Sequence, residues 1–185
     1  MGVALAQTAA SLGADVTLVL GPTQQNFDLK GLNTIRVESA AEMMQACDTA
    51  FKDAEISILA AAVADYKPKK ISAQKIKKTE ADLHIELEPT VDILATLGKK
   101  KRNNQILVGF ALETNDELNY AKDKLSRKNL DFVVMNSLRE KGAGFGHETN
   151  KVVVLGKNNI HIETELLPKP EIAQAIWEII LKYYA

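Results

Sequence analysis

The residues best placed for chemistry follow apolar runs of the sequence, and the first such place is the run Ala60 to Tyr66. In open parallel sheets, ligands bind beyond the carboxyl ends of the strands. The side chains of Ala61, Ala62 and Ala64 are small enough to let a ligand approach the backbone, and Asp65 adds a carboxylate where the apolar run ends. Alternatively, the alanines only allow tight packing and the acid caps a turn.

A second candidate is the basic cluster Lys75, Lys77 and Lys78, on the segment that leads away from this strand end. The ammonium group of lysine is a compact positive charge that suits phosphate oxygens. A lysine run without context is more often a solvated surface. The short sequence distance from Asp65 weakens that alternative and keeps a phosphate-binding role open.

A third candidate is the pair Lys124 and Lys128, in a segment, 115–128, whose apolar residues recur at helical spacing. The two lysines stand one turn apart, so both ammonium groups can point the same way. They are equally suited to the carboxyl end of a helix, where the helix dipole favours positive charge. The sequence leaves both interpretations open.

Two further places could complete a nucleotide site. The turn from Glu88 to Ile93 leads into a helix, whose free backbone amides attract anions. Thr90 or Asp92 could instead simply cap that helix. Phe110 stands near the end of another apolar run and could offer a flat surface to a base, although packing in the core is the commoner role of such a residue.

Other catalytic constellations are missing from the sequence. It has no glycine-rich phosphate loop of the Walker or dinucleotide type, and His84, His147 and His161 are too scattered for a zinc site. The one cysteine, Cys47, excludes an internal disulfide and suits a small buried apolar position. A reducing, cytoplasmic setting is therefore expected.

The charge balance excludes two classes of partner. The 185 residues carry a formal net charge of -1, so no global field steers the protein onto nucleic acid or an anionic membrane. No stretch approaches the ~20 apolar residues of a membrane helix. We therefore expect a soluble protein that binds no nucleic acid and no membrane, with any basic site formed locally.

These candidate residues need a scaffold, and the sequence predicts an α/β one in a single domain, 1–185. Apolar runs alternate with amphipathic helices, which is typical of a doubly wound, mostly parallel Rossmann-like sheet with helices on both faces. The predicted strands are 15–20, 34–37, 56–62, 83–87, 106–111 and 132–135. The predicted helices are 1–12, 39–52, 92–100, 115–128 and a last one from about residue 170.

The end of the sequence predicts a β-hairpin. Strands 152–155 and 160–163 flank Gly156-Lys157-Asn158-Asn159, a composition typical of a tight turn. These late strands offer an edge for pairing with a second copy of the chain, so we expect a homodimer.

Five quoted segments, in this order and spacing, resemble phosphopantothenoylcysteine synthetase, the CTP-dependent ligase of coenzyme A synthesis. The similarity covers essentially the whole chain, and the combination is specific although each segment alone is weak. The segments are Ala61 to Tyr66, Lys75 to Lys78, Gly109 to Asn115, Lys128 to Asp131, and Gly144 to Gly146 with Thr149 to Lys151.

The resemblance implies that the carboxylate of 4'-phosphopantothenate attacks the α-phosphate of CTP, and that the amine of cysteine then displaces CMP from the acyl-cytidylate. Two anions must meet, so charge neutralisation by lysines and Mg²⁺ is the expected catalysis. By motif, Lys75 becomes the catalytic residue and Asp92 a metal ligand. The implied nucleotide-binding residues are Ala61, Ala62, Ala64, Asp65, Lys75, Val91, Asp92, Ile93, Leu94, Phe110, Lys124 and Lys128.

The chain departs from the family pattern at two places. Val91 stands where the family has proline, which leaves the backbone shape of that turn open. Met1 and Gly2 align with the end of the family's Asn-His-Ser-Ser-Gly-Lys-Met-Gly loop, so the strand and loop before them are not part of this sequence. The resemblance then implies weak CTP binding and poor catalysis by this chain alone.

Two other functions stay open at this stage. One is a catalytically silent nucleotide-binding or assembly module, which the absent loop favours. The other is an NAD(P)-dependent oxidoreductase, which the fold pattern alone would suggest and the absent glycine fingerprint opposes. The family also implies partners, because its members often form dimers and many are fused behind a flavin-dependent decarboxylase.

Overall fold

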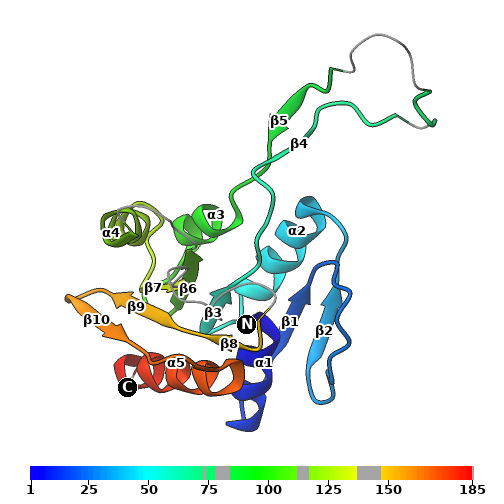
Figure 1. Cartoon of the computed structure of the whole chain (residues 1–185). Coiled ribbons are helices and arrows are strands. Elements are labelled where there is room, and N and C mark those ends of the chain that lie inside the picture. Colours follow the sequence, from blue (N-terminus) through cyan, green and yellow to red (C-terminus); the bar gives the residue numbers. More distant parts are fainter. Residues whose placement is uncertain (73, 78–83, 112–116, 137–146, 185) are drawn as a thin grey trace.

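A computed structural model describes residues 1–72, 74–77, 84–111, 117–136 and 147–184. The elements are α1 (Gly2–Ser11), β1 (Thr17–Leu20), β2 (Asn33–Arg36), α2 (Ala40–Phe51), β3 (Ile56–Leu59), β4 (Tyr66–Pro68), β5 (Leu87–Pro89), α3 (Ile93–Lys100), β6 (Ile106–Ala111), α4 (Glu117–Arg127), β7 (Phe132–Asn136), β8 (Thr149–Asn150), β9 (Val152–Gly156), β10 (Ile160–Glu163), β11 (Leu167–Pro168) and α5 (Lys169–Tyr184). The predicted α/β fold is confirmed (Figure 1).

The central sheet has the strand order β10-β9-β7-β6-β3. Strands β3, β6 and β7 run parallel, and β9 and β10 continue the sheet antiparallel. The residues of β6 and β7 are almost all buried, which explains why both read as unbroken apolar runs in the sequence. Their carboxyl ends define the edge at which a ligand is expected.

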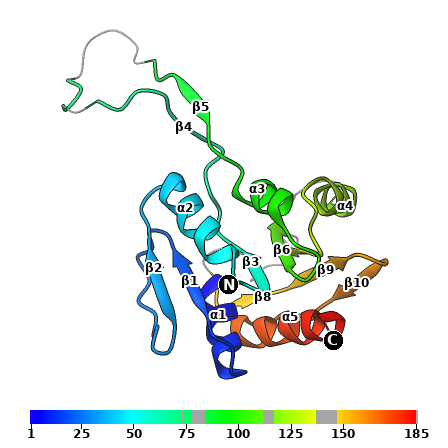
Figure 2. The same ribbon diagram turned by 180° about the vertical axis from the view of Figure 1, so that it is seen from behind.

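The sheet separates two apolar cores. Alternate residues of each strand point to opposite faces. Leu107 and Val133 therefore pack with α2, α3 and α4, whereas Val108 and Val134 pack with α1 and α5. Figures 1 and 2 show this layering from both sides. The lone tryptophan, Trp177 of α5, donates a hydrogen bond of 2.9 Å from Nε1 to the carbonyl of Leu5 and ties α5 to α1.

Local signals in the sequence account for several element ends. Ser39 caps α2 by accepting from the backbone N–H of Glu42, and the Glu42 carboxylate reaches back to the N–H of Glu38. The predicted hairpin forms between β9 and β10, with Asn158 and Asn159 both in the left-handed region. Strand β9 lies between β7 and β10, so the edge that the two late strands offer is that of β10.

An ionic cluster fixes the amino end of the sheet, opposite the expected ligand edge. Asp131 directly precedes β7 and accepts hydrogen bonds from Lys101 (2.6 Å), Lys157 (2.8 Å) and the backbone N–H of Leu107 (2.8 Å). Burial alone would raise the pKa of Asp131, but the two lysines and the N–H lower it below its ordinary value. The cluster joins the starts of β6 and β7 to the hairpin.

Strands β4 and β5 form an antiparallel arm that projects from the rest of the chain (Figure 1). We call β4, β5 and the described residues between them the arm. Two cross-strand ion pairs, Lys67 with Glu88 and Lys69 with Glu86, are exposed. The sequence did not predict the arm. It predicted a strand over residues 83–87, whereas β5 spans Leu87–Pro89. Leu83 lies outside the described residues.

The sheet is interrupted between β1 and β3. Strand β1 pairs with β2 in a separate parallel sheet, and β3 pairs only with β6 among the described strands. All four residues of β3 are only partly buried, in contrast to those of β6 and β7. Figures 1 and 2 show the amino terminus between these two strands. In the part of the chain that is described, no helix is both long and apolar enough for a transmembrane span.

Candidate functional site

The start of α3 is the centre of the candidate site. Asp92 caps this helix, because its Oδ1 accepts a hydrogen bond of 2.9 Å from the backbone N–H of Ala95. The side chains of Ile93 and Leu94 are buried in the core, so only their backbone N–H groups could meet an anion. Of the two caps that the sequence allowed, Asp92 is the one that forms.

Lys128, which follows α4, reaches this helix start. Its Nζ lies 2.6 Å from Oδ2 of Asp92, and its side chain is only 13% exposed. Partial burial tends to raise the pKa of Asp92, but the hydrogen bonds from Lys128 and Ala95 lower it below its ordinary value. The pair therefore holds one ammonium group beside the free amides of α3.

Lys124 lies one turn before Lys128 and points to the neighbouring strand end. Its Nζ donates a hydrogen bond of 2.8 Å to the carbonyl of Phe110 in β6. The two lysines thus face the sheet edge, as the helical spacing predicted. The ring of Phe110 packs with the core on the α1 and α5 side of the sheet, so its predicted contact with a base remains a prediction.

Thr90 ties the segment after β3 to the start of α3. Its hydroxyl donates to the carbonyl of Ala64, and its backbone N–H donates to the carbonyl of Asp65 at 2.8 Å. These bonds close the root of the arm. They bring Ala64 and Asp65, which end the run of small residues, next to Thr90, directly before the segment of Val91, Asp92, Ile93 and Leu94 that starts α3. Two candidate segments that are distant in sequence are therefore neighbours.

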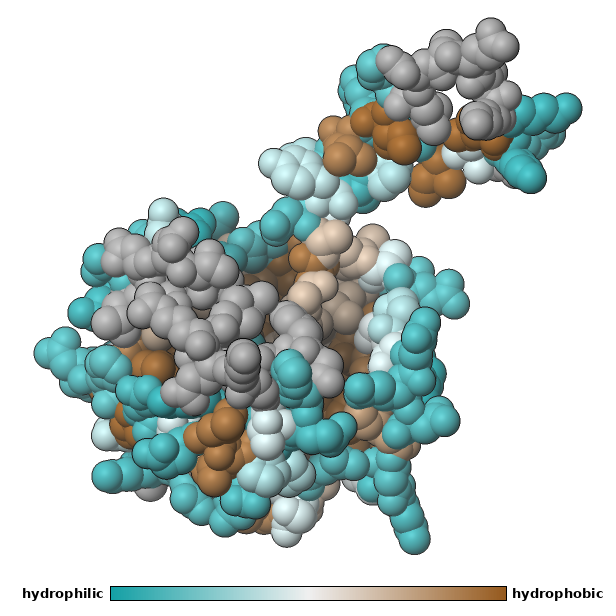
Figure 3. Space-filling model, viewed as in Figure 1, coloured by the Kyte–Doolittle hydropathy of each residue, from teal (hydrophilic) through white to brown (hydrophobic). Residues whose placement is uncertain are grey.

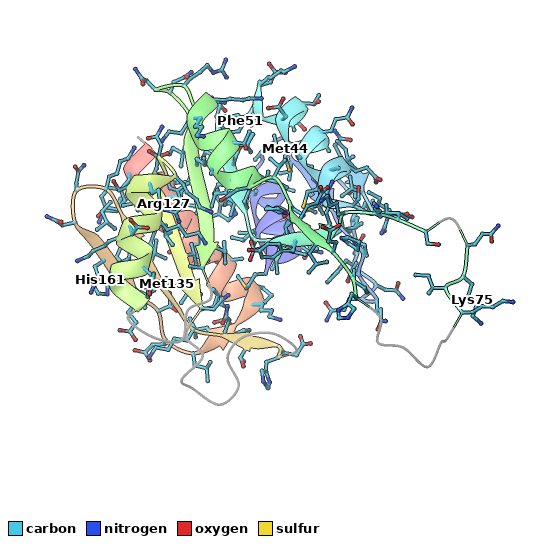
Figure 4. The ribbon with its side chains drawn as sticks, turned by 90° about the horizontal axis from the view of Figure 1, so that it is seen from above. Met44, Phe51, Lys75, Arg127, Met135 and His161 are labelled. Atoms are coloured by element: carbon cyan, nitrogen blue, oxygen red, sulfur yellow. The ribbon has the colours of Figure 1, made fainter. Side chains whose placement is uncertain are left out.

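Lys75 lies apart from these residues. It is exposed, and Figure 4 shows it at the outer end of the arm. Asp65 stands at the root of the same arm, directly before β4. The single chain therefore brings Lys124, Lys128 and Asp92 to the sheet edge, whereas the predicted catalytic lysine lies elsewhere. Lys78 lies outside the described residues.

The described residues do not by themselves form a metal site. They contain no group of three or more His, Cys, Asp or Glu side chains that could hold an ion. Both carboxylate oxygens of Asp92 already have partners, in Ala95 and Lys128. Mg²⁺ usually takes only one or two protein carboxylates and completes its shell with phosphates and water. Asp92 as a metal ligand remains a prediction that requires Lys128 to move.

Two open depressions lined by described residues lie away from the candidate site: one of about 540 Å³ beside α1, lined by Gln7, Asp28 and Lys30 among others, and one of about 460 Å³ between β10 and α5. Figure 3 shows a further hollow with apolar walls where the arm meets the body.

Sequence reasoning missed two residues that shape this site, Gly98 and Asn129. Asn129 follows α4 with a φ of 52° and donates from Nδ2 to the carbonyl of Gly98 at 2.9 Å. A lone glycine inside an amphipathic helix and an asparagine just after another helix were the available signals. Neither signal says which two helices would meet.

Known proteins resemble this chain along its whole length. A curated cysteine/cysteine sulfinic acid decarboxylase of an unknown prokaryotic organism is 52% identical over 181 residues, which are 98% of this chain and 50% of that protein. The coenzyme A biosynthesis bifunctional protein CoaBC of Bacillus subtilis strain 168 is 44% identical over 181 residues, 97% of this chain and 44% of that protein. The chain therefore spans about half the length of these relatives.

A solved structure and a family pattern agree with this. The crystal structure of the C-terminal domain of a coenzyme A biosynthesis bifunctional protein CoaBC matches with a TM-score of 0.80 and 40% identity, covering 97% of this chain and 79% of that one. Residues 1–184 match the family described as DNA/pantothenate metabolism flavoprotein C-terminal domain. The sheet, its helices and every residue of the candidate site fall within that match, and the chain belongs to this family.

Proposed function

We propose that this chain binds CTP and carries the ligase reaction that joins 4'-phosphopantothenate to L-cysteine in coenzyme A biosynthesis. The observation that carries the proposal is the convergence of Lys124 and Lys128 on the carboxyl edge of β6, beside the free amides of α3. This edge is where open parallel sheets bind ligands. Membership of the family supports the same reaction.

The first step joins two anions, and the site is suited to that problem. A carboxylate oxygen of 4'-phosphopantothenate attacks the α-phosphorus of CTP, while the bond from that phosphorus to the bridging oxygen breaks and pyrophosphate leaves with the electron pair. Lys128 and the α3 amides would lower the repulsion between the reactants. Lys124, fixed by the carbonyl of Phe110, would add a second positive charge next to them.

The second step transfers the acyl group. The amine nitrogen of cysteine attacks the acyl carbon, CMP leaves with the electrons of the broken carbon–oxygen bond, and the amine releases its proton. Orientation is the contribution that the fold can make here, because a bound acyl-cytidylate turns a bimolecular reaction into a local one. The loop of small residues between β3 and Asp65 would let the intermediate lie against the backbone.

We propose that Mg²⁺ binds together with the nucleotide rather than at a separate protein site. Its oxygen ligands would come mainly from the triphosphate, because Asp92 is engaged by Lys128. The chemistry that it supplies when bound is neutralisation of phosphate charge.

Calorimetry with CTP, combined with an assay for pyrophosphate release, tests the proposal. We expect CTP to bind, and pyrophosphate to appear only when 4'-phosphopantothenate is also present. Lys128→Met should weaken binding of CTP, whereas Lys30→Ala, which removes an exposed charge far from the site, should not. Binding of CTP without turnover in every form of the protein would instead indicate a silent binding module.

Two other outcomes would contradict the ligase proposal. Tight binding of NADPH without any response to CTP would indicate an oxidoreductase. Release of carbon dioxide from cysteine without CTP would indicate the reaction in the name of the 52% identical relative. Both are measured in the same mixtures, by titration with NADPH and by trapping of carbon dioxide.

We further propose that a strand preceding Met1 lies between β1 and β3. Both strands lack a partner on that side among the described residues, and the apolar residues of β3 are only partly buried. The start of α1 adjoins the end of β3, since a Cβ on Gly2 would lie 3.8 Å from that of Ala60. A strand in this slot would lead into α1 and complete a right-handed βαβ unit with β1.

Amide hydrogen exchange tests this slot. The chain extended by the residues encoded directly upstream of Met1 should show slower exchange in β1 and β3 than the 185-residue chain, and unchanged exchange in β7. The extended chain should also bind CTP more tightly, because the added loop would reach the same sheet edge. Equal exchange in the two forms would contradict the slot.

A homodimer is proposed to bring Lys75 to a site. The arm exposes apolar side chains that a second copy could cover, namely Tyr66, Ile71, Ile76, Ile85 and Leu87. Figure 3 shows this apolar surface along the arm. Light scattering should give twice 20.3 kDa for the chain and 20.3 kDa for Ile71→Ser with Ile85→Ser. A mass of 20.3 kDa for the unmodified chain would contradict the dimer.

A mixture of two inactive variants tests whether the arm serves the partner. Lys75→Ala and Lys128→Met should each be nearly inactive alone. If the arm of one copy enters the site of the other, mixing the two variants should restore part of the activity, because half of the sites in mixed dimers are intact. No recovery in mixed dimers would mean that each arm serves its own chain.

A further inference from the structure

We propose that Gly98 and Asn129 are positioning residues, which fix the end of α4 against α3 so that the ammonium group of Lys128 stops at the start of α3. The relevance of this arrangement to catalysis rests on the proposed function. The arrangement itself rests on contacts between described residues and can be tested without any ligand.

Glycine is required at position 98 because the backbone of Lys128 occupies the place where a Cβ would lie. A Cβ added at Gly98 would lie 1.9 Å from the carbonyl oxygen of Lys128 and 3.0 Å from its carbonyl carbon. Both atoms belong to the backbone, so they cannot turn away as a flexible side chain would. Any larger residue at position 98 must therefore push the end of α4 away from α3. Glycine is otherwise unfavourable inside a helix, so this contact gives a physical reason for its presence.

Asn129 holds the same end of α4 from the other side. It adopts the left-handed conformation, with a φ of 52°, which asparagine tolerates better than most residues. The N–H of Leu130 donates to the carbonyl of Leu125 and the N–H of Asn129 to that of Ser126, which is the Schellman pattern of helix termination. The Asn129 side chain then donates to the carbonyl of Gly98 at 2.9 Å.

These two contacts set the starting point of the Lys128 side chain. From its Cα beside Gly98, the chain extends along α3 to Asp92, six residues earlier, which is about 9 Å along the helix axis at 1.5 Å per residue. The Nζ arrives 2.6 Å from Oδ2 of Asp92. A shift of the α4 end away from α3 would carry the Cα of Lys128 with it, and we expect this to weaken the ion pair. The contact between α3 and the end of α4 thus sets the position of the Lys128 ammonium group.

Gly98→Ala tests the inference with two measurements. In a crystal structure of the variant, the distance from Nζ of Lys128 to Oδ2 of Asp92 should lengthen well beyond 2.6 Å, because the added methyl displaces the end of α4. In the full enzyme, KM for CTP should rise about tenfold, which corresponds to 1.4 kcal/mol, while kcat stays nearly unchanged. Gly21→Ala is the matched control, since its added methyl would meet only the flexible end of Met43, at 3.2 Å.

Asn129→Gly is the second variant, in case Gly98→Ala does not fold. It keeps the left-handed turn and removes only the hydrogen bond to Gly98, so it should lengthen the distance between Lys128 and Asp92 by a smaller amount. A folded Gly98→Ala or Asn129→Gly protein with that distance unchanged would overturn the inference. If the distance changes while even the unmodified protein ignores CTP, the positioning stands and the proposed function fails.

Discussion

The arm and the sheet edge carry the two halves of the candidate site, and they are built in opposite ways. At the edge, Lys124 and Lys128 are held by a carbonyl and a carboxylate, and the helix start beside them is fixed by Thr90 and Asp92. On the arm, Lys75 stands among exposed residues on a two-stranded ribbon. An isolated two-stranded ribbon has little stability of its own in water.

This difference suggests that the sheet edge determines ligand affinity, whereas the arm supplies the catalytic lysine. The edge is positioned by the same packing that stabilises the fold, so changes there should affect both stability and ligand affinity. The described residues of the arm are exposed except for Glu88, which is partly buried, so changes there should affect activity without affecting the stability of the body. The four predictions below test that contrast, from the largest expected effect to the smallest.

Removal of the arm lysine should have the largest effect. We expect Lys75→Ala to lower kcat by about 10²- to 10³-fold, the range found when one stabilising group of a transition state is removed. The free energy of unfolding should not change. Steady-state kinetics and urea denaturation measure the two quantities, and Lys69→Ala, an exposed lysine on the same arm, is the matched control. A similar loss in both variants would mean that total arm charge matters rather than position 75.

Removal of the ionic cluster should lower the free energy of unfolding and leave kcat unchanged. Asp131→Asn leaves the buried ammonium of Lys101, whose side chain is 6% exposed, without its carboxylate. We expect a loss of about 2 kcal/mol in unfolding free energy, below the 3 to 5 kcal/mol of fully buried pairs because Asp131 is partly exposed. The kcat of the folded enzyme should hold. Asp123→Asn, in an exposed pair with Arg127, should change little.

Acid should destabilise the edge and the body together. The pKa values of Asp92 and Asp131 lie below the ordinary value, so both carboxylates contribute stability above about pH 4, where they are charged in the unfolded chain as well. That contribution is lost as the pH falls through their lowered pKa values. Urea midpoints measured from pH 7 to pH 3 should drop below about pH 4, and less steeply in Asp131→Asn. A flat profile would contradict the role of these pairs.

An apolar arm residue should matter least to the fold. Ile85 is 61% exposed, so Ile85→Ser should change the unfolding free energy of the body by no more than about 0.5 kcal/mol. Thermal denaturation at low protein concentration measures this. A Tm drop of the size expected for Asp131→Asn would show that the arm is part of the stabilised core after all.

The sequence predicted the sheet better than it predicted the connections. The runs Ile106–Ala111 and Phe132–Asn136 are recognisable because both faces of a central parallel strand are buried. The arm was missed because its strands are short and its apolar residues lie in solvent, so no burial pattern marks them. Which strand of the hairpin forms the edge could not be predicted, because a sequence shows hairpin partners but not which strand pairs on the other side.

The candidate site was predictable in part for the same reason. Asp92 and Lys128 were proposed separately, and only the fold places them 2.6 Å apart. Their meeting depends on how closely two helices approach, which is set by Gly98 and by the turn at Asn129. Residues 112–115 and 144–146, which were quoted for the family resemblance, lie outside the described residues and add nothing to this comparison.

The bond between the indole of Trp177 and the carbonyl of Leu5 gives the molecule a built-in optical reporter. No other tryptophan contributes to the emission, because the sequence has only this one. Its ring senses how α1 sits on α5, and α1 starts next to the slot between β1 and β3. Fluorescence of the unlabelled protein should therefore register polypeptide entering that slot, in real time and without any dye.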